Sequence, residues 1–324
     1  MSYDPRLHPQ IVQVFEAMKA AGVQRVEALT PEMARHQHRR LARARVEPEI
    51  ELGLIETFAI DAPGRRIPVR MYYPQGFEEA LEKTGPLPVL FYFHGGGHVI
   101  GDLDTHDQAV RALAKKANCL AISVDYRKGP ENPFPGAVED CFFATKYFID
   151  RAERYGIDAD RVAVGGDSAG GNLATVVALM ARDEGGPKIA FQLLIYPVVD
   201  YRGGYPSYKA YGKGFGILEE ETVDYFRRGY LADLAQLEDW RVSPILAASF
   251  EGLPPAIIQL AELDVLHDEG VLYAEKLREA GVPVEVKEYK GQIHAFYTFT
   301  HMVDDAHRAQ DDSAAALRKA FGTA

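Results

Sequence analysis

Apolar segments of strand length alternate with amphipathic helical segments along most of this 324-residue chain, and this order restricts the fold more than any other feature. Several of the apolar segments are nearly uninterrupted, as expected for parallel strands that are covered on both faces. The order predicts an α/β fold with a doubly wound, mostly parallel sheet. The expected strands are 88–93, 120–125, 161–165, 190–196, 256–261 and 284–289, and the expected helices are 107–118, 137–155, 169–183, 268–280 and 304–321.

Three regions depart from this alternation. Around the turn 61–64, apolar and polar residues alternate from Phe58 to Tyr73, which predicts an antiparallel hairpin at one edge of the sheet. Apolar residues at helical spacing predict a helix near the N-terminus, and a second helix is expected over 31–45 with a proline in its first turn. Residues 201–239 are rich in tyrosine and glycine and lack a core strand, so we expect a helical cap over the carboxyl edge of the sheet.

The segment 162–171 predicts a reactive serine. Its apolar first half leads into Gly166-Asp167-Ser168-Ala169-Gly170, and an amphipathic helical pattern follows. A strand, a sharp turn and a helix are the context of a nucleophile elbow, in which strained backbone lifts the serine hydroxyl clear of the sheet. A solvated serine in a glycine-rich turn is the alternative, because a five-residue motif also occurs by chance.

A serine nucleophile needs donors for the oxyanion, a base and an acid that orients the base. The run Gly95-Gly96-Gly97 after the first buried strand can expose bare backbone N–H groups, and Ala169 adds another at a helix N-terminus. A phosphate-binding loop is the alternative, but neither Gly-Lys-Ser/Thr nor Gly-x-Gly-x-x-Gly is present.

Two later strands supply the other two groups. Asp264 follows the segment 256–261 and is the expected acid, with Asp268 as the alternative. His294 follows the last strand and is the expected base, whereas His301 and His307 belong to the following segment and helix. The chain order Ser168, Asp264, His294 is that of α/β-hydrolases.

Composition narrows the class of partner and compartment. The chain is 47% hydrophobic and carries a formal net charge of −11, so we expect no nucleic-acid partner. No apolar run of membrane-spanning length occurs, and we expect no membrane partner. Only two cysteines, Cys119 and Cys141, are present, which favours the cytoplasm. The spacing of histidine and cysteine indicates no metal site, and we expect no cofactor.

These motifs resemble those of the hormone-sensitive-lipase family of α/β-hydrolases, which includes bacterial carboxylesterases, over nearly the whole chain. The resemblance rests on the segments 94–97, 125–127, 130–135, 166–171 and 196–197. It implies a mostly parallel eight-stranded sheet, with N-terminal cap helices in 1–50, a catalytic domain in 51–200 and 240–324, and a cap insertion in 201–239. It also implies that Ser168, Asp264 and His294 form the triad and that Gly95, Gly96 and Ala169 donate to the oxyanion.

The expected activity is therefore that of a serine carboxylesterase with short-to-medium acyl esters. The same triad could instead cleave amides, lactones or carbamates, and a non-catalytic binding protein on this scaffold is a further alternative. We expect His98, Asp167, Tyr201 and Phe215 to line the substrate pocket. The resemblance also implies a possible homodimer through the edge strand Val284–Tyr289. Departures from the family pattern are Val265, Ala295, His98 and the pair Lys128-Gly129.

Overall fold

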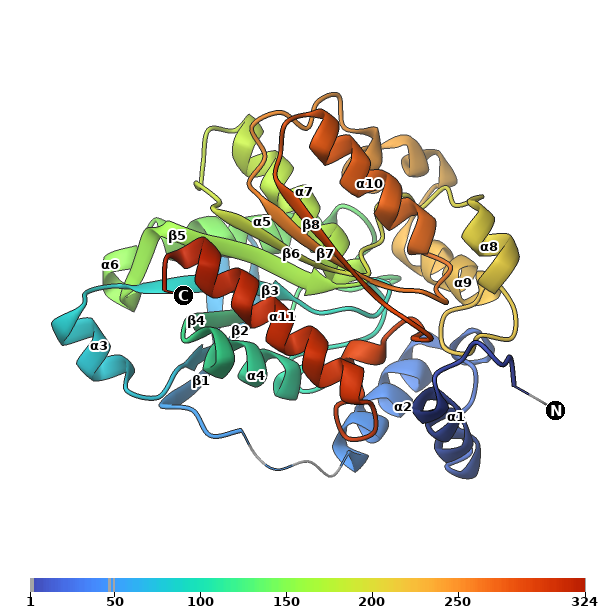
Figure 1. Ribbon diagram of the computed structural model, residues 1–324. Helices are drawn as coiled ribbons and strands as arrows, with labels where there is room; N and C mark the ends of the chain where they lie inside the picture. Colours follow the sequence, from blue (N-terminus) through green and yellow to red (C-terminus); the bar gives the residue numbers. More distant parts are fainter. Residues whose placement is uncertain (1–2, 46–47, 49, 324) are drawn as a thin grey trace.

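An eight-stranded sheet forms the centre of the computed structural model, which describes residues 3–45, 48 and 50–323 (Figure 1). The strands lie in the order β1-β2-β4-β3-β5-β6-β7-β8. The hairpin of β1 and β2 is antiparallel, β2 pairs antiparallel with β4, and all other pairs are parallel. The mostly parallel sheet with an antiparallel hairpin at one edge is therefore confirmed. The strand bounds are β1 Leu54–Ala62, β2 Arg65–Tyr73, β3 Leu87–Phe93, β4 Leu120–Val124, β5 Ile157–Asp167, β6 Phe191–Ile195, β7 Ala256–Ala261 and β8 Val284–Tyr289.

Helices cover both faces of the sheet and create two apolar layers. Along β3, Val89, Phe91 and Phe93 enter one layer, and Leu90 and Tyr92 enter the other. This division follows from the alternation of side chains along a strand, and it explains why the central strands read as continuous apolar runs. The first layer packs against α5 (Gly136–Ile149), α7 (Ala169–Asp183) and α10 (His267–Glu279), and the second packs against α4 (Asp107–Ala117) and α11 (Asp304–Phe321).

Two local predictions need correction. The helix expected over 137–155 is divided into α5 and the short α6 (Ala152–Tyr155), because the backbone leaves helical geometry at Arg151, where φ is −124°. A short helix, α3 (Phe77–Lys83), joins the hairpin to β3 and was not expected. With seven residues and none of them buried, α3 has no apolar stripe long enough to reveal its period.

Two segments far apart in sequence lie together at the carboxyl end of the strands (Figure 1). The first contains α1 (Pro9–Ala20), the 3₁₀ turn η1 (Val26–Ala28) and α2 (Pro31–Ala44), and the second contains α8 (Pro206–Tyr211) and α9 (Glu220–Tyr230). Arg25 pairs with Glu219 at 2.7 Å, and Thr222 Oγ1 donates to Glu27 at 3.0 Å. The remaining 3₁₀ turns are η2 (Leu234–Glu238), η3 (Pro244–Leu246) and η4 (Phe296–Thr298).

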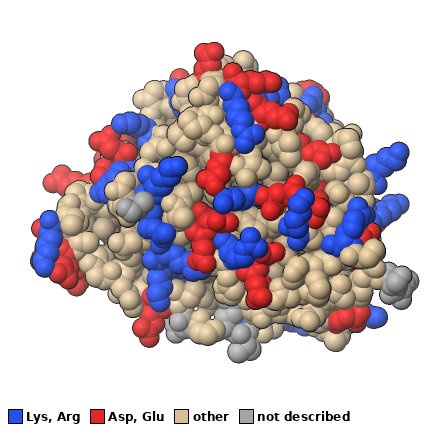
Figure 2. Space-filling view, in the orientation of Figure 1, with Lys and Arg blue, Asp and Glu red and all other residues tan. Residues whose placement is uncertain are grey.

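Pro31 occupies the first turn of α2, as expected, and the Thr30 hydroxyl accepts a hydrogen bond from the Met33 N–H. On the face shown in Figure 2, basic and acidic side chains are interspersed. Among the described residues, no helix combines the length and apolar character needed to cross a bilayer.

Candidate active site

Ser168 stands at the sharp turn between β5 and α7. Its φ of 55° and ψ of −117° place a non-glycine residue in strained backbone, as the elbow motif predicts. The neighbouring glycines permit this turn. A Cβ at Gly166 would lie 2.2 Å from the Phe93 carbonyl oxygen, and a Cβ at Gly170 would lie 1.8 Å from the same atom. The glycines of the motif are therefore required by close packing between β3 and the elbow.

The structure brings Ser168, His294 and Asp264 into one hydrogen-bonded chain. Ser168 Oγ lies 2.8 Å from His294 Nε2, and His294 Nδ1 lies 2.6 Å from Asp264 Oδ2. Because a carboxylate only accepts, Nδ1 carries the hydrogen and leaves Nε2 free to accept the serine hydroxyl proton. The second Asp264 oxygen accepts the Leu266 N–H at 3.0 Å, which fixes the carboxylate in place. All three side chains are nearly buried.

Asp268, the alternative acid, faces a different histidine. Its Oδ1 contacts His267 Nδ1 at 3.0 Å, and its Oδ2 accepts the Ser207 N–H at 2.8 Å. His267 in turn contacts Glu288. Asp268 therefore ties α10 to the insertion after β6, and Asp264 is the carboxylate that reaches His294.

The glycine loop after β3 differs from the expectation at one position. The Gly95 N–H donates to Asp167 Oδ1 at 3.0 Å, so the prediction that Gly95 supplies a free donor to the pocket is wrong. Gly96 and Gly97 line the same cavity as Ser168 and His294. The carboxylate that precedes the serine thus occupies the N–H group of the first glycine.

Asp167 is buried and accepts three hydrogen bonds. The donors are the Gly95 N–H, the Tyr92 hydroxyl at 2.7 Å and His106 Nε2 at 3.3 Å. Burial opposes the charged form, but the electrostatic interaction with His106 and the hydrogen bonds from His106 and Tyr92 lower the pKa of Asp167 to about 2. Asp167 also lines the cavity, as expected from the sequence.

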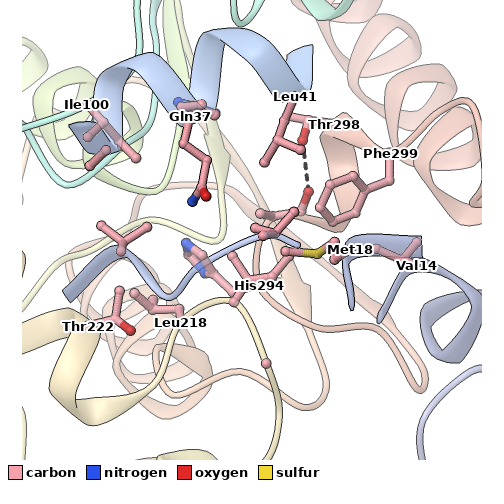
Figure 3. Close-up of a pocket in the computed structure, with 18 of the residues that line it drawn as sticks. Val14, Met18, Gln37, Leu41, Ile100, Leu218, Thr222, His294, Thr298 and Phe299 are labelled. Atoms are coloured by element: carbon pink, nitrogen blue, oxygen red, sulfur yellow. Dashed lines mark hydrogen bonds between the residues drawn. The ribbon is translucent and has the colours of Figure 1, made fainter. Parts of the chain in front are cut away.

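A cavity of about 380 Å³ opens above Ser168, near the lower end of the range of roughly 300–1,000 Å³ that is usual for small-molecule sites. Figure 3 shows that its side chains lie on two sides of His294. Ile100, Leu218 and Thr222 lie on one side, and Val14, Met18, Leu41 and Phe299 lie on the other. Both the N-terminal helices and the insertion after β6 contribute to this lining.

Three expected pocket residues do not line the cavity. His98 is fully buried and stacks on Tyr230, with ring centres 3.8 Å apart. Tyr201 packs in the same aromatic cluster, 5.8 Å from His98. Phe215 packs against Tyr211 and Arg6. These predictions are wrong because aromatic side chains near a predicted site were read as lining, whereas here they support the loop and the cap from behind.

Sequence reasoning missed most of the lining. The residues that it did not identify include Val14, Met18, Gln37, His38, Leu41, Ile100, His106, Leu218, Thr222, Phe226, Thr298, Phe299 and Met302. Val14 and Met18 belong to the apolar spacing that predicts the N-terminal helix, and this spacing does not distinguish a cavity from a core. The stretch Thr105-His106-Asp107 after the glycine loop was a usable signal, because it places a histidine near the carboxyl edge of the sheet. Within the described residues, no group of three or more His, Cys, Asp or Glu side chains is placed to hold a metal ion.

The site defines a triad hydrolase of the α/β class. Its serine lies on a strained elbow after β5, its aspartate on the loop after β7 and its histidine on the loop after β8. The profile of the family described as alpha/beta hydrolase fold matches residues 90–298, and the chain belongs to this family. The resemblance to the hormone-sensitive-lipase family is thereby confirmed.

Known proteins agree with this classification. Esterase LipI of Mycobacterium tuberculosis is 40% identical over 288 residues, which cover 89% of this chain and 88% of that protein. The ethyl acetate hydrolase of Pseudomonas putida is 36% identical over 311 residues, covering 94% of this chain and 95% of that protein. Among solved structures, an ester hydrolase from the metagenome of Lake Arreo, in complex with a derivative of bipyridine phosphonate, has a TM-score of 0.91 and 39% identity, covering 98% of this chain and 100% of that one.

Proposed function

We propose that this protein is a serine carboxylesterase. The observation that carries the proposal is the hydrogen-bonded chain from Ser168 through His294 to Asp264, which ends in a cavity lined largely by apolar side chains. Similarity to proteins named as an esterase and an ethyl acetate hydrolase supports it. An uncharged ester suits such a cavity, because its alkyl groups gain from leaving water and its carbonyl can reach the serine.

In the acylation step, Ser168 Oγ attacks the ester carbonyl carbon while His294 Nε2 takes the hydroxyl proton. The tetrahedral intermediate then collapses as His294 gives that proton to the departing alkoxide, and the acyl group stays on Ser168. Water, deprotonated by His294, attacks the acyl carbon and releases the carboxylic acid. Asp264 keeps the hydrogen on Nδ1 and stabilises the imidazolium that forms in each half of the reaction.

We assign the oxyanion to the N–H groups of Gly96, Gly97 and Ala169. Gly96 and Gly97 line the cavity beside Ser168 and present no side chain to a substrate oxygen. Ala169 is the first residue of α7, so its N–H has no acceptor within the helix and lies at the positive end of the helix dipole. Such donors stabilise the developing negative charge, and the loss of one costs on the order of 10²–10³ in rate.

The two sides of the cavity suggest where the two parts of an ester bind. We assign the leaving alcohol to the side with Met18 and Phe299, which come from the N-terminal helices and the segment after His294. The acyl chain then lies toward the glycine loop, where Leu218 and Phe226 limit its length. A cavity of about 380 Å³ favours short-to-medium acyl chains over long ones.

Replacement of Ser168 with alanine tests the activity directly. We expect Ser168→Ala to lower the hydrolysis of p-nitrophenyl butyrate by at least about 10⁴-fold, because the acyl-enzyme can no longer form. The melting temperature should change little, since the hydroxyl contacts only His294 among the described side chains. Labelling of the wild-type protein by a fluorophosphonate should also be lost in the variant. Retained turnover by the pure variant, or an unlabelled wild type, would refute the proposal.

The organisation of the protein follows the same proposal. We place the cap helices in residues 1–50 and 201–239 and the catalytic domain in 51–200 and 240–324. The outer strand β8 pairs only with β7, so its free edge is available for a homodimer, which light scattering after size exclusion would detect. Two buried cysteines without a disulfide support a cytoplasmic location.

A further inference from the structure

The carboxylate of Asp167 joins three separate parts of the active-site wall. Tyr92 belongs to β3, Gly95 to the glycine loop and His106 to the start of α4, and all three donate to Asp167. The contact with the loop is also steric, since a Cβ at Gly95 would lie 2.3 Å from Asp167 Oδ2. The residue directly before Ser168 therefore fixes the segment that leads to Gly96 and Gly97.

His106 is held so that it donates to this carboxylate. Its Nε2 faces Asp167 Oδ2, which only accepts, so Nε2 carries a hydrogen. Its Nδ1 lies 2.9 Å from the Thr105 hydroxyl, and that hydroxyl is itself bound to the Asp102 backbone. His38 from α2 lies edge-on to His106, with ring centres 6.1 Å apart. The imidazole of His106 is thus oriented by the turn 102–105 and covered by His38 of α2.

A glycine loop needs such an anchor. Glycine has the largest backbone freedom of any residue, so three in succession do not hold two N–H groups in a fixed direction by themselves. The Gly96 carbonyl accepts the N–H groups of Val99 and Ile100, which closes the far side of the loop. On the near side, the Gly95 N–H has Asp167 as its acceptor. A carboxylate beside the developing oxyanion destabilises it, because both groups are negatively charged. The benefit of Asp167 at this position must therefore come from holding the loop in place.

A carboxylate accepts from all three donors at once, with the hydrogen of His106 on Nε2. An asparagine side chain would turn an NH₂ group toward either the Gly95 side or His106 Nε2. The first arrangement puts a donor against the Gly95 N–H, and the second requires His106 to move its hydrogen to Nδ1, toward Thr105 Oγ1. We propose that Asp167 is a positioning residue that, together with His106, sets the direction of the Gly96 and Gly97 N–H groups toward the oxyanion. This inference rests on the proposed esterase function.

The test is Asp167→Asn, normalised to the fraction of protein that a fluorophosphonate labels. We expect kcat for p-nitrophenyl butyrate to fall about 10- to 100-fold, with KM nearly unchanged. This fall is no larger than the fall in rate that follows the removal of one oxyanion donor. The affinity for a trifluoromethyl ketone, whose adduct with Ser168 places an oxyanion in the hole, should fall by the same factor as kcat/KM. The affinity for an alkyl ether of the same length, which forms no adduct, should not change.

Two comparisons separate positioning from a general loss of structure. Asp140 is equally buried and binds Arg65 and Arg127 away from the cavity, so Asp140→Asn should lower the melting temperature without changing the ratio of ketone to ether affinity. His106→Gln keeps a donor toward Asp167 and should retain more kcat than His106→Phe, which has none.

The inference is overturned if Asp167→Asn keeps wild-type kcat, or if ketone and ether affinities fall together. Failure of the wild type to hydrolyse esters or to react with the fluorophosphonate would instead refute the proposed function. The two failures are therefore distinguishable.

Discussion

The two walls of the cavity are built in different ways. The wall at the sheet edge depends on backbone geometry: Ser168 has a φ of 55°, and Ala295, next to His294, has a φ of 69°. The cap wall consists of side chains on regular helices, such as Met18 on α1 and Leu41 on α2. Hydrogen bonds of the triad fix the first wall, whereas ion pairs on partly exposed arginines, including Arg25 with Glu219, join the parts of the second.

The two walls should therefore control two different properties of the enzyme, the rate of ester cleavage and the choice of ester. Changes in the sheet-edge wall should alter the rate of bond cleavage for every ester, because they move the atoms that react. Changes in the cap wall should alter which ester is cleaved, because they change the volume that the alkyl groups fill.

The largest expected effect is at the acid of the triad. Asp264→Asn should lower kcat on the order of 10⁴-fold, because an amide no longer holds the hydrogen on His294 Nδ1. Asp268→Asn is the matched control, since Asp268 binds His267 and the Ser207 N–H. It should lower stability by about 1 kcal/mol and leave kcat close to that of the wild type. Steady-state kinetics and thermal unfolding measure both, and the opposite pattern would move the acid to Asp268.

A smaller effect, confined to the choice of ester, is expected at Phe226. Its ring lies against the glycine loop, so that a Cβ at Gly97 would be 2.1 Å from Phe226 Cγ. Phe226→Leu should shorten this barrier and raise the ratio of kcat/KM for decanoate over butyrate esters about tenfold. The profile over a series of p-nitrophenyl esters measures the shift.

Phe250 is a suitable control for Phe226, because it is similarly buried but packs against Tyr273 away from the cavity. Phe250→Leu should lower stability and leave the acyl profile unchanged. If both variants shift the profile alike, or if Phe226→Leu shifts only the alcohol preference, the acyl chain does not bind beside Phe226.

The same contrast explains which parts were predictable from sequence. Ser168 and Asp264 follow the buried strands β5 and β7, whose apolar runs are recognisable in the sequence, and His294 follows the partly exposed edge strand β8. Parallel strands bring their carboxyl ends to one edge of the sheet, so the three residues were expected to meet there. The cap residues that line the cavity have no comparable sequence pattern. Met18 sits on an amphipathic helix, where a side chain that faces a cavity and one that faces a core look the same.

His98 shows why an aromatic side chain near the site was misread. The fully buried imidazole stacks on Tyr230 from the cap, and neither ring nitrogen has a hydrogen-bond partner among the described residues. Burial lowers the pKa of His98 to about 3, so the ring is neutral at physiological pH and acts as an aromatic spacer. Its contribution is packing behind the loop, which sequence position alone does not distinguish from contact with substrate.

His98→Phe should therefore preserve activity and increase stability. Phenylalanine can stack on Tyr230 and removes two buried nitrogens, so we expect a gain in the free energy of unfolding of up to about 1 kcal/mol. The ester profile should match that of the wild type. Denaturant unfolding and kinetics on the same ester series check both parts. A change in acyl preference would place His98 in the substrate pocket after all.

The smallest expected effect is at Ala295, where the backbone of the sheet-edge wall has a residue with a side chain in the left-handed region. That conformation costs a non-glycine residue about 1–2 kcal/mol, and glycine gives back about 0.4–1 kcal/mol through the entropy of the unfolded chain. Ala295→Gly should thus raise the free energy of unfolding by about 0.5–1 kcal/mol. Ala280, with a φ of −82° at the end of α10, is the control, and Ala280→Gly should lower the free energy of unfolding.

The kcat of Ala295→Gly should stay near the wild-type value, because His294 is fixed by Ser168 and Asp264 on either side. A fall in kcat together with the gain in stability would show that strain at Ala295 helps to orient the imidazole.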